Sequence, residues 1–197
     1  MDISDIKRLN TLWAEVYPCL AKQVVSVLPE DPHEMLEIGP FSGGISFELA
    51  KTIQGCSITI VERMERTSGY LAEEVRWRHL SGRVRVVRGD LSELPFHAET
   101  FDAVIFRGAF FFLDASMLRG IHRLLAPGGA GFVGGGFGVF TPRELIDGIA
   151  DESRRLNQRL GRKWVTREHV EEMVMRAGVE RYAKIIEDGG LWVLLWR

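Results

Sequence analysis

The stretch LEIGPFSGGISFELA, residues 36–50, decides how this chain is organised. An apolar run ends at Ile38, glycines follow, and an amphipathic stretch begins beyond Gly44. A glycine-rich turn between a strand and a helix is typical of sites for nucleotide-like ligands, because the helix start presents free N–H groups to an anionic group. Phe41 fills the middle position of the dinucleotide fingerprint G-x-G-x-x-G, where a side chain would crowd a pyrophosphate. We therefore expect a ligand without phosphates, the alternative being a plain tight turn.

Short apolar runs alternate with amphipathic stretches along most of the chain. Strands are expected at 34–38, 57–62, 83–88, 101–107 and 129–135, and helices at 45–54, 65–80 and 115–125. This alternation predicts an α/β fold, a mostly parallel sheet with helices on both faces.

After Gly138 the pattern changes to two helices, expected at 141–161 and 166–178. Thr141 and Thr166 are the expected N-caps, with Pro142 at the first position of the earlier helix. The last two apolar runs, 179–187 and 191–197, are joined by Asp-Gly-Gly. That tight turn predicts an antiparallel hairpin.

Length and composition limit the organisation further. The 197 residues suit one domain, which we divide into an N-terminal helical cover (1–30), a cofactor-binding core (34–138), a helical cap (139–178) and a C-terminal hairpin (179–197). The formal charge of -2 argues against nucleic acid as a partner. The N-terminus does not resemble a signal peptide, and no apolar run approaches the roughly 20 residues that span a bilayer. We expect a cytoplasmic protein without membrane segments.

Two acids follow the predicted strands. Glu62 ends the second strand and Asp90 follows the third, so both fall with Gly39 at the carboxyl edge, where open α/β sheets bind ligands. A carboxylate at 62 can accept hydrogen bonds from both hydroxyls of a ribose. One at 90 can accept a bond from an adenine amino group, with Leu91 covering the ring. The alternatives are a surface glutamate and an ordinary turn.

Four motifs in this order resemble the class I S-adenosylmethionine-dependent methyltransferases over about residues 34–138. They are EIGPFSGG, VER, GDLSELPFHAETFDAVIFRGAFFFL and IHRLLAPGGAGFVGG. The later pieces GGGFG and GGLWV resemble a small prokaryotic, type 11-like subgroup. The resemblance implies a Rossmann-like seven-stranded sheet of order 3-2-1-4-5-7-6 with strand 7 antiparallel, and S-adenosyl-L-methionine as the cofactor.

The resemblance also implies a set of cofactor contacts. Glu37, Gly39 and Gly43 would surround the methionine end, and Tyr17 would contribute from an N-terminal helix over 11–24. The full set is Tyr17, Glu37, Gly39, Pro40, Gly43, Glu62, Arg63, Met64, Gly89, Asp90, Leu91, Arg107 and Gly108.

Methyl transfer from a sulfonium needs alignment and a dry site, and it needs a base only if the acceptor must lose a proton. Candidate acceptor contacts are Arg107, Phe111, Phe137, Arg143, Arg154 and Trp192. Arg107 either holds an anionic substrate or forms an ordinary salt bridge, and the phenylalanines at 110–112 favour core and lid packing. The segment 139–165 holds the cations Arg143, Arg154, Arg155, Arg159, Arg162 and Lys163 against four acids. It is either a solvated helix face or a cap over an anionic molecule.

No residue is assigned a catalytic role. The amino-methylating pattern Asn-Pro-Pro-Tyr is missing after the fourth strand, and Cys19 is expected in the core rather than as a nucleophile. The five histidines show no metal spacing, and Cys19 and Cys56 form no CxxC pair, so we expect neither a metal nor a disulfide.

The leading hypothesis is S-adenosylmethionine-dependent methyl transfer to a small molecule, which the arginines suggest is anionic. An RNA or protein methyltransferase would need a continuous basic surface or an added recognition domain. A nicotinamide oxidoreductase is disfavoured by Phe41 and by the lack of a Tyr-x-x-x-Lys pair. A non-catalytic sensor or assembly protein that binds the cofactor remains an alternative, and a homodimer is allowed.

Overall fold

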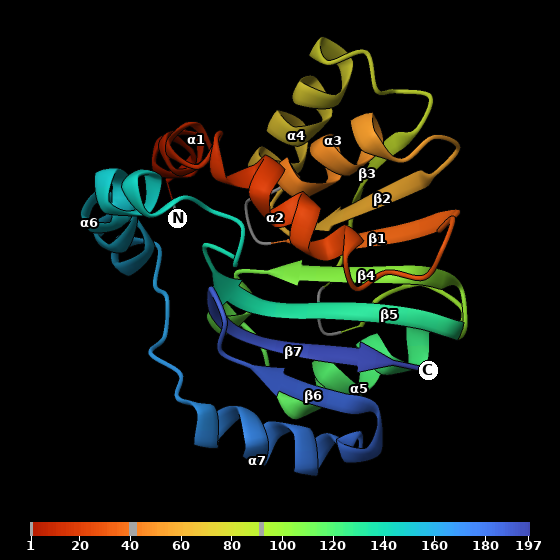
Figure 1. Cartoon of the computed structure of the whole chain (residues 1–197). Helices are drawn as coiled ribbons and strands as arrows, with labels where there is room; N and C mark the ends of the chain where they lie inside the picture. Colours follow the sequence, from red (N-terminus) through yellow and green to blue (C-terminus); the bar gives the residue numbers. More distant parts are fainter. Residues whose placement is uncertain (1, 40–42, 91–92) are drawn as a thin grey trace.

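The computed structural model describes residues 2–39, 43–90 and 93–197, which form an α/β fold around one twisted sheet (Figure 1). Its strands are β1 (Glu34–Ile38), β2 (Ser57–Glu62), β3 (Val84–Arg88), β4 (Phe101–Arg107), β5 (Leu125–Gly136), β6 (Ala183–Ile186) and β7 (Gly190–Trp196). They lie in the order β3-β2-β1-β4-β5-β7-β6. Strands β1 to β5 run parallel, and β7 is antiparallel to both β5 and β6. The predicted fold class and strand order are confirmed.

Helices cover both faces of the sheet because successive side chains of each strand point to opposite sides. Met35 of β1 packs into one hydrophobic cluster and Leu36 into the other. The first cluster includes residues of α1 (Ile3–Leu12), α2 (Val16–Val25), α3 (Gly44–Thr52), α4 (Glu65–Trp77) and α6 (Arg143–Arg159). The second includes α5 (Ala115–Leu124) and α7 (Arg167–Ala177). Single-turn helices, η1 (Ala109–Phe111) and η2 (Glu180–Tyr182), follow β4 and precede β6.

The N-terminal segment differs from the single helix expected over 11–24. It forms two helices, because the chain turns at Trp13, whose side chain is buried and whose indole Nε1 donates to Ser153 Oγ at 2.9 Å. This turn brings α1 beside α6 (Figure 1). Cys19, expected in the core, is only half-buried on α2.

The C-terminal third contains further differences. Thr141 does not cap α6, because its hydroxyl donates to the Phe137 carbonyl, and Pro142 occupies the N-cap position instead. Thr166 caps α7 as predicted, accepting a bond from the His169 N–H. The hairpin is confirmed, but its first strand begins at Ala183 rather than at 179.

The two helices of the segment predicted as a cap over 139–178 lie on different faces of the sheet. Leu156 and Leu160 place α6 and its end in the cluster shared with α1, whereas Val170 and Val174 place α7 in the cluster shared with α5. Figure 1 shows α6 beside α1 and α7 at the opposite end of the molecule, below β6. Only α6 is therefore positioned to cover a ligand near the N-terminal helices.

Candidate cofactor and acceptor site

Strand register brings four candidate residues to one level at the carboxyl edge of the sheet. Ile38 pairs with Val61, Glu37 pairs with Ile105, and Arg107 pairs with Gly134. Glu62, Gly39, Arg107 and Gly134 consequently form a row across β2, β1, β4 and β5. This edge is where open α/β sheets bind ligands.

Gly39 and Glu62 form the centre of this row. The Gly39 N–H donates to the Val61 carbonyl at 2.8 Å, and a Cβ on Gly39 would stand 2.8 Å from Glu62 Oε2. Only glycine lets the carboxylate lie so close to β1. The Glu62 side chain is buried, and its Oε1 accepts from the Met64 N–H at 3.0 Å, where α4 begins. A buried carboxylate held in this way can accept hydrogen bonds from a pair of hydroxyl groups.

Glu37 organises the turn between β1 and α3. Its Oε1 accepts from the Gly43 N–H at 3.0 Å, and its Oε2 accepts from the Ser46 N–H at 2.9 Å and from the Ser46 hydroxyl. These bonds satisfy two donors at the start of α3, as an N-cap side chain does. Gly43 has φ +82°, a left-handed conformation that favours glycine. Pro40 and Phe41 lie outside the described residues.

The predicted adenine end lies beyond β2 and β3. A cavity of about 340 Å³ is lined by Arg63, Arg88, Gly89 and Asp90. The Gly89 N–H donates to the Glu62 carbonyl at 3.2 Å, which holds this turn beside the end of β2. Arg63 places its guanidinium carbon 4.1 Å from the centre of the Phe112 ring. Leu91 lies outside the described residues, so the cover it was predicted to provide stays a prediction.

Arg107 is a buried cation at the end of β4. Its residue is 5 % exposed, and its guanidinium carbon lies 4.1 Å from the centre of the Trp13 ring and 5.4 Å from that of Tyr17. Within residues 2–39, 43–90 and 93–197 it makes no hydrogen bond or ion pair. A desolvated cation–π contact is worth about 2 kcal/mol, whereas burying an unpaired charge costs several kcal/mol. Arg107 is thus a buried cation that contacts aromatic rings and has no acidic partner in the described part of the chain.

Tyr17 holds the N-terminal helices against the start of α3. A Cβ on Gly44 would stand 2.4 Å from its ring, so the ring packs directly on the Gly44 backbone. Its hydroxyl donates to Asn10 Oδ1 at 2.6 Å. Burial raises the pKa of Tyr17 to about 12, so the phenol stays protonated at neutral pH and is unsuited to act as a base.

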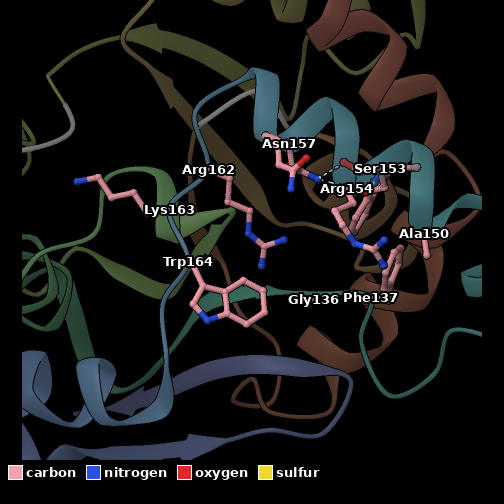
Figure 2. Close-up of a pocket in the computed structure, with 11 residues that line it drawn as sticks. Gly136, Phe137, Ala150, Ser153, Arg154, Asn157, Arg162, Lys163 and Trp164 are labelled. Carbon is pink, nitrogen blue, oxygen red and sulfur yellow. Dashed lines mark hydrogen bonds between the residues drawn. The ribbon is translucent and has the colours of Figure 1, made fainter.

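A cavity of about 270 Å³ opens between α6, the end of β5 and the loop that follows α6 (Figure 2). Its lining comprises Trp13, Gly136, Phe137, Ala150, Ser153, Arg154, Asn157, Gln158, Arg162, Lys163 and Trp164. An inner recess of about 20 Å³ shares Trp13, Gly136, Asn157 and Arg162 with it and reaches Arg107. The Trp13 and Phe137 rings are stacked, with centres 4.8 Å apart. Among the described lining residues of both spaces there is no carboxylate and no imidazole.

The candidate acceptor contacts separate into two groups. Phe137 and Arg154 line the outer cavity, and Arg107 and Phe111 line the inner recess, which also includes Gly108. Trp192 does not line either space, because it is fully buried and stacks on Phe132 with ring centres 4.2 Å apart. Neither space therefore supports its predicted role as an acceptor contact, which stays a prediction.

Most arginines of the predicted cap contact acids or backbone at the surface. Arg143 pairs with Asp147 at 2.9 Å, Arg154 pairs with Asp151 at 2.8 Å, and Arg159 pairs with Asp5 at 2.6 Å. Arg155 donates to the Asp151 carbonyl. The solvated helix face is accordingly the better description of this part of α6, and Arg143 lines neither space.

Sequence reasoning missed several lining residues, among them Trp13, Asn157 and Trp164. The only sequence signal for Trp13 was its place in the amphipathic N-terminal stretch, and nothing in the pattern indicated that this stretch meets α6. No group of three or more metal-ligating side chains occurs in the described part of the chain. Across the same residues, no helix combines the length and apolar character that crossing a membrane requires.

The strand order, the glycine turn after β1 and the acid that ends β2 define the Rossmann-like methyltransferase class. Residues 35–129 match the sequence family described as a methyltransferase domain. In sequence and fold the chain is similar to the S-adenosylmethionine-dependent methyltransferases. The cofactor of this family is S-adenosyl-L-methionine. The Gly39 cradle and the carboxylates of Glu62 and Asp90 are chemically suited to hold it.

Comparisons with known proteins agree with this assignment. The chain is 36% identical over 120 residues to the cypemycin N-terminal methyltransferase of a Streptomyces species, a match that covers 58% of this chain and 46% of that relative. The chain thus spans about half the length of this curated relative. A solved structure from Methanococcus maripaludis, assigned to the S-adenosyl-L-methionine-dependent methyltransferases, superposes with a TM-score of 0.81 at 28% identity over 95% of this chain and 87% of that one. A methyltransferase from Aquifex aeolicus shares the fold with a TM-score of 0.68 at 16% identity, covering 99% and 97% of the two chains.

Proposed function

We propose that this protein transfers the methyl group of S-adenosylmethionine to a small anionic molecule. The proposal rests on the row of residues at the carboxyl edge, where a buried carboxylate at Glu62 and a buried guanidinium at Arg107 flank β1. Glu62 would hold the ribose of the cofactor. The anionic acceptor is supported by Arg107, which lines the inner recess and has no acidic partner among the described residues.

When bound, S-adenosylmethionine supplies an electrophilic methyl group on a sulfonium, and S-adenosylhomocysteine is the product. The residues of the chain align the acceptor and exclude water, which is the main requirement of an in-line displacement. Trp13, Phe110 and Phe111 give the recess apolar walls. Because no carboxylate or imidazole lines the described cavity, the acceptor brings a nucleophilic lone pair that needs no base from the protein.

A second candidate acceptor is the amino group at the N-terminus of a peptide. The name of the Streptomyces relative favours it, and an unprotonated amine needs no base. A peptide would extend from the outer cavity past the exposed side chain of Trp164. Mass spectrometry of a small acid and of a short peptide, each incubated with the protein and S-adenosylmethionine, separates the two candidates by the product that gains a methyl group.

Calorimetry tests the cofactor part of the proposal. We expect S-adenosylhomocysteine to bind with a dissociation constant in the micromolar range, about -8 kcal/mol, and NAD to give no heat. Heat with NAD and none with S-adenosylhomocysteine would contradict it. The anionic acceptor predicts in addition that turnover falls as salt rises, because partly exposed charges are screened over about 8–10 Å at physiological ionic strength. A turnover independent of salt between low and high ionic strength would argue for an uncharged acceptor.

A further inference from the structure

A second guanidinium lies beside Arg107 and comes from a different part of the chain. Arg162 is in the loop after α6, and both arginines line the inner recess. The Nη2 of Arg162 would be 3.9 Å from a Cβ on Gly135, the neighbour of Gly134, which pairs with Arg107. Figure 2 shows the Arg162 side chain pointing from the loop into the cavity, whereas Lys163 points away from it.

The two guanidiniums repel each other in the absence of an anion. Partial burial and the nearby charge of Arg107 lower the pKa of Arg162. In the part of the chain that the structure describes, neither side chain has a carboxylate partner, although the other arginines of α6 contact Asp147, Asp151 or Asp5. Two inward-facing guanidiniums without an acidic partner are suited to an oxyanion from a ligand.

The small size of the recess favours a small oxyanion. Its volume of about 20 Å³ is close to the minimum of about 10–15 Å³ that one water molecule requires. This space suits the two oxygens of a planar carboxylate better than the three free oxygens of a phosphate ester. Arginine also matches a carboxylate in a planar, bidentate geometry.

The outer cavity suits the remainder of such a ligand. Its walls include the stacked Trp13 and Phe137 rings and the side chain of Trp164, whose residue is 90 % exposed. Figure 2 shows the Trp164 ring on the opposite side of the cavity from α6. An indole left open to solvent at the mouth of a cavity offers an apolar surface that a flat ligand would cover.

We propose that the acceptor is a carboxylic acid with a flat apolar body, its carboxylate held between Arg107 and Arg162 and its body against Trp164 and the Trp13–Phe137 stack. This inference rests on the proposed methyl transfer and specifies its substrate class. Arg107 reaches the carboxylate from the end of β4, and Arg162 reaches it from the loop after α6. The anion thereby joins the α6 loop to the edge of the sheet.

The test uses three probes that share one ring: benzoate, benzamide and phenyl phosphate. Each is titrated into ¹⁵N-labelled protein saturated with S-adenosylhomocysteine, and the indole N–H signals of Trp13 and Trp164 are followed by NMR. Trp77, exposed on α4, is the internal control. Benzoate should shift the Trp13 and Trp164 signals at millimolar concentration, while benzamide and phenyl phosphate bind at least about tenfold more weakly. Equal affinity for benzoate and benzamide would refute the proposal that the site recognises a carboxylate. Tighter binding of phenyl phosphate than of benzoate would show that the site is a phosphate site instead.

Variants then test the two arginines. Arg162→Met should weaken benzoate binding at least about tenfold and leave the affinity for S-adenosylhomocysteine within twofold. Arg107→Met should have the same two effects. If the loss of buried Arg107 prevents folding, Arg162→Met alone still tests the carboxylate site. Arg155→Met, on the exposed face of α6, is the matched control and should change nothing.

The outcomes separate this inference from the proposed function. If S-adenosylhomocysteine binds but Arg162→Met leaves benzoate binding unchanged, the carboxylate site is refuted and the methyltransferase proposal stands. If Arg162→Met weakens S-adenosylhomocysteine as much as benzoate, the arginines serve the carboxylate of the cofactor instead. If S-adenosylhomocysteine does not bind to the parent protein, the proposed function itself fails.

Discussion

Replacing Glu62 with alanine should weaken the binding of S-adenosylhomocysteine by roughly 10- to 100-fold, about 1.4–2.8 kcal/mol. The carboxylate lies buried against Gly39, and one of its oxygens accepts from the Met64 N–H. Each hydrogen bond to a charged group is worth about 1.5–3 kcal/mol. The loss of hydrogen bonds from two ribose hydroxyls would by itself weaken binding by more than this. Water that enters the space left by the carboxylate would bond to the hydroxyls and recover part of the binding free energy.

The same substitution should also lower stability slightly. It removes the acceptor of the Met64 N–H just before α4, and the loss of one such hydrogen bond costs about 1 kcal/mol. Glu62→Gln keeps the shape and one acceptor oxygen, so its stability should stay near that of the parent while its cofactor affinity falls to an intermediate value. The two variants separate the effect on binding from the effect on folding.

Isothermal titration calorimetry with S-adenosylhomocysteine measures the affinity, and thermal unfolding without ligand measures the stability. Glu65→Ala is the matched control, because Glu65 is an exposed acid of α4 that pairs only loosely with Arg88, at 3.4 Å. It should bind like the parent. If folded Glu62→Ala also binds like the parent, the ribose is held elsewhere and the assignment of this carboxylate is refuted.

Three further substitutions have measurable consequences. Gly44→Ala would place a Cβ 2.4 Å from the Tyr17 ring, so it should cost about 1–3 kcal/mol in denaturant unfolding and loosen α2. Ser153→Ala leaves the buried indole N–H of Trp13 without its acceptor, which should cost about 1–3 kcal/mol and raise proton exchange at that indole. Burial, with a smaller contribution from a nearby arginine, lowers the pKa of His122, so the unfolded chain binds its proton more readily. Stability should therefore fall as pH drops from about 6.5 through the lower folded-state pKa, and His122→Gln should flatten that part of the unfolding profile.

The sheet and its cofactor edge could be predicted because local patterns encode them. Alternating apolar runs predict the strands, and the positions of Gly39 and Glu62 directly after or at the strand ends predict that both lie at one edge of the sheet. Residues that act through nearby backbone, such as Glu37 at the start of α3, are equally accessible to sequence reasoning.

The acceptor cavity was predicted less well because long-range packing creates it. Trp13 and Ser153 are 140 positions apart, and no periodicity indicates that they form a hydrogen bond. Residues 139–165 carry an excess of basic side chains, but helical geometry places Asp147 and Asp151 within reach of Arg143 and Arg154. Composition cannot distinguish such paired arginines from Arg162, which points inward.

The origin of the cavity walls bears on how such a protein diverges. Every described residue that lines the outer cavity lies outside 35–129, the range shared with the wider family, whereas Gly39 and Glu62 lie inside it. Mutations in the first 15 residues or in 136–164 can reshape the cavity without altering the row of residues at the β1 and β2 ends. Duplicated genes could thus acquire new acceptors while retaining the same methyl donor. These two segments should be exchanged together between related enzymes to redirect specificity, because Trp13 and α6 build the cavity wall jointly.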